Sequence, residues 1–405
     1  MRFRHVGLSI AILIMVTSST WAVNSLRVIH EFNSIDGADA YSNVIVDSAG
    51  NLFATTAYGG RFHLGSVVEF TPQGDGQWAE QVLYTFSGGS DGGYSYSALV
   101  FDAAGNLYGT TFQGGDFEEG TVYRLSPGGN GQWTETVLHS FHVQDGANPY
   151  ASLIFDSTGK NLYGTTLTGG SHNGGTVFEL SPGSNGEWTE TVLYSFDNVH
   201  GSGPYANVTF DAGSLYGTTL SGGNLTACDG QGCGVIFQLK PGANGKWTPT
   251  VLHAFDGKDG ASPYAGLVTD SSGNLYGTTY GYEENEGNVF ELIRENKTWK
   301  GKILHSFSGP DGSWPRGSLV VDSGGNVYGT TSGYPDADGN VFKLSPGANG
   351  KWTETVLATF NEQNGEYPYA GLVFGPGGAL FGTTYAGGNL QACSGGCGVV
   401  FSIQP

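Results

Sequence analysis

The sequence is poor in charge, and above all in positive charge. Its 405 residues include 16 Lys and Arg against 36 Asp and Glu, which gives a formal net charge of -20. Phosphate backbones and anionic membrane surfaces are recognised by clustered Lys and Arg. We therefore expect neither nucleic acid nor an anionic membrane surface as a partner.

Long apolar runs are also scarce. The one such run, VGLSIAILIMV at 6–16, follows the basic start MRFRH and precedes the small residues TSSTWA. It is too short to span a bilayer and has the layout of a secretory signal. We predict a signal peptide at 1–22 and an exported mature chain at 23–405, secreted or periplasmic, monomeric and without membrane insertion. Loss of Arg2 and Arg4 would take the net charge from -20 to -22.

Cysteine is limited to two short segments, ACDGQGC (227–233) and ACSGGC (392–397). Close spacing and export favour two local disulfides, Cys228–Cys233 and Cys393–Cys397. A zinc site would need all four thiols together, yet the two segments belong to repeats that are not neighbours. We expect no cofactor, with Ca²⁺ as the one alternative left open.

Glycine, by contrast, is abundant, with 69 residues, and much of it lies in a repeat. NLYGTTLTGG (161–170) is one of seven copies of a variable segment, whose second threonine lies at 56, 111, 166, 219, 279, 331 and 384. Spacings of 52 to 60 residues, filled with short apolar runs, are typical of four-stranded propeller blades. The strands predicted for the third copy are YASLIFD (150–156), NLYGTT (161–166), GTVFEL (175–180) and WTETVLYSF (188–196).

The two ends of the repeat array complement each other. LRVIHEF (26–32) matches a fourth strand, whereas GVVFSIQP (398–405) matches a third strand with no fourth after it. An open array would need polar caps, while a closed ring removes exposed strand edges. The sequence predicts an all-β, seven-bladed β-propeller with four antiparallel strands per blade and a last blade closed by the N-terminal strand.

The repeated string, of the form VLYSF…DG…PYA.L.FD..GNLYGTT..GG…GTVF.L.P, resembles the GloVer tandem repeat of exported bacterial proteins. The resemblance covers nearly the whole mature chain. It implies export and a repeat fold, and it brings no catalytic residues with it.

Repeat positions are candidates for architecture rather than chemistry. A reaction centre needs unlike groups in one place, whereas the threonine pair occurs in every copy. Histidines at a shared fourth-strand position lie too far from the axis to converge on a metal, so we expect them on the outer wall: His30, His139, His253 and His305. Two interpretations stay open for the tyrosines that begin the inner strands, stacking on sugars or packing between blades: Tyr41, Tyr96, Tyr150, Tyr205, Tyr264 and Tyr369.

Departures from the repeat mark the candidate site. In the sixth copy PYA becomes PRG, which puts Arg316 in a tyrosine position with Trp314 two residues earlier, and His200 replaces an aspartate in the fourth. The loops of copies five and six lose the GG pair and carry acids instead. The ligand-binding candidates are Arg316, Trp314, His200, Glu283, Glu284, Tyr264 and Tyr369, and the Ca²⁺ candidates are Asp336 and Asp338. The alternative for the acids is a solvated rim.

These features favour a non-catalytic exported propeller that binds a glycan or a protein on the face carrying the strand 2–3 loops and the strand 4–1 connections. The alternative is a polysaccharide hydrolase or lyase that uses carboxylates of blades five and six, which would require an acid/base pair across the funnel.

Overall fold

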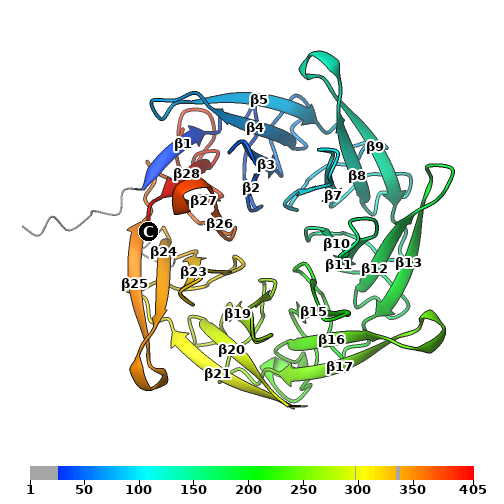
Figure 1. Cartoon of the computed structure of the whole chain (residues 1–405), viewed down its shortest axis with the longest axis vertical. Coiled ribbons are helices and arrows are strands. Elements are labelled where there is room, and N and C mark those ends of the chain that lie inside the picture. The colour runs from blue at the N-terminus through cyan, green and yellow to red at the C-terminus, as the bar shows by residue number, and fades with distance from the viewer. Residues whose placement is uncertain (1–25, 297, 334–337) are drawn as a thin grey trace, which may run out of the picture.

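The computed structural model describes residues 26–296, 298–333 and 338–405, and these form a closed ring of seven sheets (Figure 1). Each sheet has four antiparallel strands, so the predicted seven-bladed β-propeller is confirmed. The predicted signal peptide lies outside the described residues. Among the residues described, no helix is long and apolar enough to cross a membrane.

Every blade runs from a short inner strand to a long outer one. The inner strands are β2 (Ile45–Val46), β6 (Val100–Phe101), β10 (Ile154–Phe155), β14 (Thr209–Asp211), β18 (Val268–Thr269), β22 (Val320–Val321) and β26 (Val373–Phe374). The second strands are β3 (Leu52–Thr56), β7 (Leu107–Thr111), β11 (Leu162–Thr166), β15 (Ser214–Thr219), β19 (Leu275–Thr279), β23 (Val327–Thr331) and β27 (Leu380–Thr383).

The outer half of each blade is longer. The third strands are β4 (Ser66–Pro72), β8 (Thr121–Pro127), β12 (Thr176–Pro182), β16 (Val235–Pro241), β20 (Asn288–Glu295), β24 (Asn340–Pro346) and β28 (Val399–Ile403). The fourth strands are β5 (Trp78–Thr85), β9 (Trp133–Ser140), β13 (Trp188–Ser195), β17 (Trp247–Ala254), β21 (Thr298–Ser306), β25 (Trp352–Thr359) and, for blade seven, β1 (Arg27–Glu31). Short 3₁₀ turns are η1 (Gly129–Gly131), η2 (Cys228–Gly230), η3 (Ala243–Gly245), η4 (Ala348–Gly350) and η5 (Pro376–Gly378).

The N-terminal strand closes the ring as expected. β1 pairs antiparallel with β28, with Val28 opposite Phe401 and Glu31 opposite Val399 (Figure 1). The ladder continues past the strand, because the Phe32 amide donates to the Gly398 carbonyl at 3.0 Å. Phe32 itself is fully buried in the core between blades seven and one. Closure therefore satisfies the outer edge of β28 and adds an apolar anchor.

The inner strands are shorter than predicted. In blade three only Ile154 and Phe155 pair as a strand, whereas 150–153 runs alongside the axis without ladder bonds. The reason is that this inner segment is held by the neighbouring blade instead. The Thr110 hydroxyl of blade two donates to the Ala151 carbonyl in the inner segment of blade three at 3.2 Å.

The same bond recurs in six of the seven blades and explains the first threonine of the pair there. Its donor–acceptor distances lie between 2.7 and 3.2 Å. The bonds join Thr55 to Ser97, Thr110 to Ala151, Thr165 to Ala206, Thr218 to Ala265, Thr330 to Ala370 and Thr383 to Ser42. Buried hydroxyls are costly unless bonded, so each threonine satisfies itself and fixes the next blade.

The second threonine holds the loop between strands two and three. In blade three the Thr166 hydroxyl donates to the Thr168 carbonyl at 2.9 Å and accepts from the Thr176 amide at 3.1 Å. Equivalent pairs of bonds form in blades one, two, four and seven. They are missing in blades five and six, where the hydroxyls of Thr279 and Thr331 are buried without a partner.

The glycine before the threonines makes room for an aromatic ring. Gly164 lies directly opposite Phe178, and a Cβ there would come within 2.5 Å of the ring. The same pairing occurs in five more blades. Blade one is the exception, because it has alanine (Ala54) at this position and the smaller Val68 opposite it. The two positions therefore change size together, as close packing requires.

We expect Gly164→Ala alone to destabilise the protein by about 1–3 kcal/mol through overpacking. Phe178→Val alone should cost on the order of 3 kcal/mol through the cavity it leaves. The double variant reproduces the pair that blade one already has. Its loss of stability should therefore be smaller than the summed losses of the two single variants by at least about 1 kcal/mol. Urea unfolding of the four proteins measures this, and additive losses would contradict the interpretation.

Candidate site on the propeller axis

The axis is surrounded by one repeat position. Six blades place a tyrosine there and blade six places an arginine: Tyr41, Tyr96, Tyr150, Tyr205, Tyr264, Arg316 and Tyr369. We call these residues the axial ring. Two residues earlier, every blade has a left-handed backbone with φ between 50° and 67°, at Asp39, Tyr94, Asn148, Gly203, Ser262, Trp314 and Tyr367. This turn sends each inner segment toward the axis.

The axial tyrosines pack on one another. Tyr96 stacks on Tyr150 with centroids 4.5 Å apart, and Tyr150 contacts Tyr205 at 4.0 Å. Tyr41 closes the circle by lying 5.0 Å from Tyr96 and 5.5 Å from Tyr369. Burial raises the pKa of Tyr150 well above its ordinary value. Its hydroxyl therefore stays protonated and remains a hydrogen-bond donor.

Arg316 occupies the one break in this ring. Its guanidinium carbon lies 5.0 Å from the ring of Tyr264, 4.7 Å from that of Tyr280 and 4.5 Å from that of Tyr369. Burial disfavours its charge, but the Tyr280 hydroxyl and the surrounding tyrosines outweigh burial and raise the pKa of Arg316 above its ordinary value. The side chain is therefore a permanent cation held against aromatic faces.

A hollow of about 90 Å³ lies on the axis, and the axial ring lines it. Small and polar residues of the same inner segments complete the lining, among them Asn43, Ser152, Asn207 and Ser318. None of the described residues that line the hollow carries a carboxylate or an imidazole.

More aromatic residues surround the axial ring on the loop face, which is the face bearing the strand 2–3 loops and the strand 4–1 connections. We call this set the outer aromatics: Tyr58, Tyr94, Phe112, Tyr280, Trp314, Tyr367 and Tyr385. Each is partly or largely exposed. They contact the axial ring or each other, as in Tyr385 with Tyr41 at 5.0 Å and Trp314 with Tyr280 at 5.2 Å.

The structure brings some of the predicted site residues together and separates others. Arg316, Tyr264 and Tyr369 are in contact, and Trp314 joins them through Tyr280. Glu283 and Glu284 are exposed and line a separate hollow with Asp256 and Lys258. His200 lies on a connection, bonded to Asp197 at 2.9 Å, and is not among the residues lining the axial hollow.

The proposed Ca²⁺ residues are only partly visible. Asp336 lies outside the described residues. Asp338 lies near Glu366, and burial together with the Asp338 charge raises the pKa of Glu366 to about 7. The neighbouring Asp338 charge thus favours the protonated form of Glu366.

Both predicted disulfides are confirmed, Cys228–Cys233 and Cys393–Cys397. Each bridge lies within a single strand 2–3 loop, the first in blade four and the second in blade seven. Cys233 and Cys397 are buried at the edge of the inter-blade cores, so the bridges anchor these loops on the loop face.

The fourth-strand histidines lie on the outer part of the blades and are paired, a partnership that the sequence analysis missed. His30, His253 and His305 each place Nε2 within 3.0 Å of an aspartate six residues later, and His139 lies 3.3 Å from Asp145. These aspartates belong to the DG step of the connection to the next blade. The constant spacing of His to DG was the available signal.

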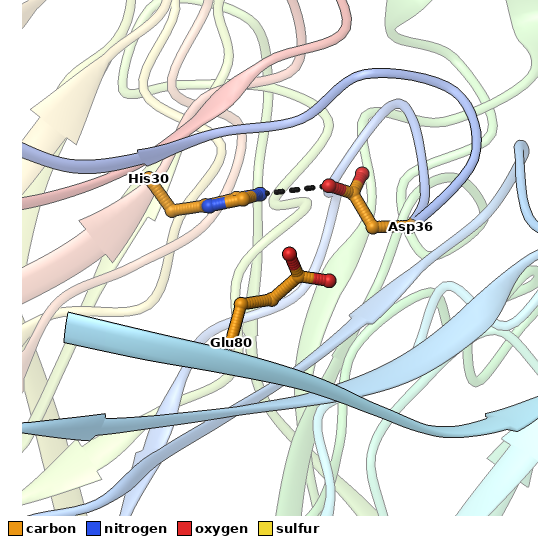
Figure 2. Close-up of side chains that lie close together, drawn as sticks. All are labelled: His30, Asp36 and Glu80. Carbon is orange, nitrogen blue, oxygen red and sulfur yellow. Dashed lines mark hydrogen bonds and ion pairs between the residues drawn. The ribbon is translucent and has the colours of Figure 1, made fainter.

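At the closing junction this pair gains a third member. His30 of β1, Asp36 of the connection and Glu80 of β5 converge, and their ligand atoms lie within 4.8 Å of one another (Figure 2). Nitrogen and carboxylate donors suit a divalent transition metal. Asp36 already accepts two bonds from Asn33, at 3.0 and 2.7 Å. His30 and Asp36 are thus hydrogen-bonded without a metal, and together with Glu80 they form a group of described residues whose ligand atoms lie close enough to hold one.

At the equivalent junction between blades two and three, a glutamate is buried beside the aspartate of the connection, Asp145. Glu190 of β13 has a buried carboxylate oxygen without a partner, and burial followed by the Asp145 charge raises its pKa to about 8. The same junction opens into a hollow of about 620 Å³, where Asp145 also binds His142 at 2.6 Å.

The fold and the axis define the class: a closed seven-bladed propeller built from one repeat, with an aromatic axial site. The chain belongs to the Gloeobacter/Verrucomicrobia repeat family, whose sequence pattern matches residues 64–232 and 225–405. This confirms the resemblance inferred from the repeated string.

Solved structures agree on the fold. An ancestral GH74 enzyme superposes with a TM-score of 0.57 at 12% identity, over 91% of this chain and 48% of that one. A protein from Lactobacillus plantarum gives a TM-score of 0.53 at 16% identity, over 79% and 85%. The major pollen allergen Pha a 1 of Phalaris aquatica is 28% identical over 198 residues, 44% of this chain and 70% of the allergen. At these identities the structural likeness shows the fold alone.

Glu190 makes the stability of the fold depend on pH. Its folded-state pKa of about 8 exceeds the ordinary value of 4.5, so the folded state binds the proton more tightly. Its contribution to stability is therefore greatest below pH 4.5 and is lost as pH rises toward 8. Glu190→Gln, which cannot ionise, should be more stable than the parent at pH 8, and this gain should fade toward pH 5.

Thermal unfolding at pH 5, 6, 7 and 8 measures the difference between parent and variant. Glu187→Gln, which changes an exposed carboxylate of the same hairpin, is the matched control. A pH-independent difference for Glu190→Gln would show that the carboxyl does not titrate in this window.

Proposed function

We propose that this protein is an exported, non-catalytic, carbohydrate-binding propeller. It holds a glycan over the axis on its loop face. One observation carries the proposal: the axial ring and the outer aromatics form a continuous patch of aromatic and hydroxyl-bearing side chains around a single cation. Such rings offer apolar faces to sugars while their hydroxyls offer hydrogen bonds.

The axial site favours binding over hydrolysis. Glycoside hydrolysis uses two carboxyl groups on either side of the scissile bond. The described residues that line the axial hollow supply none, and the exposed acids Glu283 and Glu284 line a different hollow. This arrangement weighs against the alternative of a hydrolase that uses carboxylates of blades five and six.

The surroundings of the site support a binding face. Of the ten large apolar side chains that are exposed among the described residues, eight lie on the loop face: Ile35, Tyr58, Phe62, Phe117, Val143, Val199, Leu225 and Leu390. All eight lie on the part of the ring that runs from blade seven through blades one, two and three to blade four, in these blades or in the connections between them. An exposed apolar surface of this kind commonly marks an interaction site.

A protein ligand is the second candidate, and the aliphatic members of this surface favour it. Ile35 is 81% exposed, Val199 59% and Val143 51%, and aliphatic side chains of this kind suit a protein partner better than a sugar ring.

Export forms part of the proposal. It rests on the signal-like residues 1–22, and the two disulfides are consistent with a location outside the cytoplasm.

The test uses residues 23–405 with a panel of neutral and acidic polysaccharides, scoring retained protein and released oligosaccharides in the same tubes. Two variants exchange an outer aromatic for the residue that another blade has at the same position: Tyr94→Asn, as at Asn148, and Trp314→Ser, as at Ser262. Both should keep the backbone conformation. Each should weaken retention about tenfold, which corresponds to about 1.4 kcal/mol.

Val82→Thr, an exposed apolar position on an outer strand, is the control and should bind like the parent. Released oligosaccharides would overturn the proposal in favour of a hydrolase or lyase. Equal failure of the parent and all variants to be retained would exclude the glycan and leave the protein ligand.

A further inference from the structure

The substitution at the axial ring leaves donors without acceptors. Arg316 buries its Nε without a hydrogen-bond partner. Next to it, the first threonine of blade five breaks the pattern of the ring. The Thr278 hydroxyl is buried without a partner, whereas its six counterparts bond across to the next blade. Buried donors of this kind, one of them charged, are costly to leave unpaired.

Among the described residues, no carboxylate forms an ion pair with this cation. Every ion pair among the described residues joins a histidine to an aspartate, and none involves Arg316. The acid at the rim, Asp39, lies beside Tyr41 and Tyr385, and burial raises its pKa to about 6. In a chain with a net charge of -20, the lining of the hollow thus holds one cation and, among the described residues, no carboxylate.

Two polar residues of the lining, Asn43 and Ser152, use their oxygen atoms as acceptors for backbone amides. The Asn43 amide oxygen accepts from the Gly371 amide at 2.6 Å, so the NH₂ group of Asn43 is left to donate. The Ser152 hydroxyl oxygen accepts from the Ala98 amide at 2.9 Å, which leaves its own proton for another acceptor. With the protonated tyrosine hydroxyls, these groups make the hollow rich in donors.

Size limits what can enter. The hollow measures about 90 Å³. An engineered cavity of about 150 Å³ accepts benzene, so a sugar ring does not fit here. A carboxylate or sulfate group is small enough, and the planar fork of an arginine matches such groups well.

We propose that the axial hollow binds an oxyanion, a carboxylate or sulfate group, on Arg316. The inference rests on the proposed function and deepens it: the glycan is an acidic one, and its acidic substituent is the group that Arg316 binds. The same chemistry would accept a free inorganic or organic anion.

The first experiment titrates sodium sulfate and sodium acetate into residues 23–405 by calorimetry at constant ionic strength. Arg316→Tyr restores the residue that the other six blades have and therefore should fold. We expect saturable binding to the parent and binding that is weaker by about tenfold or more in Arg316→Tyr, the loss of a charge-assisted hydrogen bond. Arg316→Lys, which keeps the charge but not the fork, should fall between them.

Arg294→Gln is the matched control, because Arg294 is exposed on an outer strand and packs on Trp299. It changes the net charge by the same amount and should bind anions like the parent. Equal anion binding by the parent and Arg316→Tyr would overturn the proposal, as would absence of binding to the parent.

A second arm compares retention on dextran sulfate with retention on dextran, its neutral backbone. Preference for dextran sulfate that is lost in Arg316→Tyr supports the acidic glycan. Arg316-dependent sulfate binding without that preference would assign the hollow to a free anion and overturn the acidic-glycan assignment. Equal retention of dextran by parent and Arg316→Tyr, with no anion bound, would sustain the proposed function and reject the oxyanion site.

Discussion

The centre of this propeller depends on a hydrogen bond that six of the seven blades make, from the first threonine of the pair to the inner segment of the next blade. The bond crosses the interface at the narrowest part of the ring, where there is no room for a full ladder, as in Thr165 to Ala206. The inner segment is held by this bond where it has no strand ladder to pair with. Because the acceptor is the residue directly after the axial ring position, each such bond also fixes one axial side chain. The aromatic axis is thus a consequence of how neighbouring blades are joined.

The same dependence explains why blades five and six differ from the rest. Their strand 2–3 loops lack the GG pair, and the second threonines Thr279 and Thr331 have no bonds to those loops. The first threonine of blade five, Thr278, also lacks its bond to the blade that carries Arg316. The unsatisfied hydroxyls of the threonine pairs therefore gather in blades five and six. The other copies of the repeat satisfy the equivalent hydroxyls. The unpaired hydroxyls of blades five and six are therefore the physical reason to place a ligand site beside Arg316.

Much of the fold could be predicted because a repeat multiplies weak signals. Seven copies of one pattern gave the number of blades, and the matching ends gave the closure by β1. The disulfides followed from spacing within single loops. The predicted inner strand at 150–156 was too long, since strand propensity does not report that convergence at the axis excludes ladder partners. The grouping of Glu283 and Glu284 with Arg316 was inferred from the shared face, but loops of one face extend to different radii.

The sequence by itself determined the ring, its closure, its two bridges and the single arginine in a tyrosine position, because each is a matter of period or local spacing. Only the tertiary structure decided that the tyrosines pack on one another, that the histidines pair with aspartates between blades, and that Arg316 and Thr278 are left with unpaired donors. The contacts of the axial ring join residues about fifty positions or more apart, across interfaces that exist only once the ring is closed. Each histidine pairs with an aspartate only six positions away, and the turn into the next blade places that aspartate.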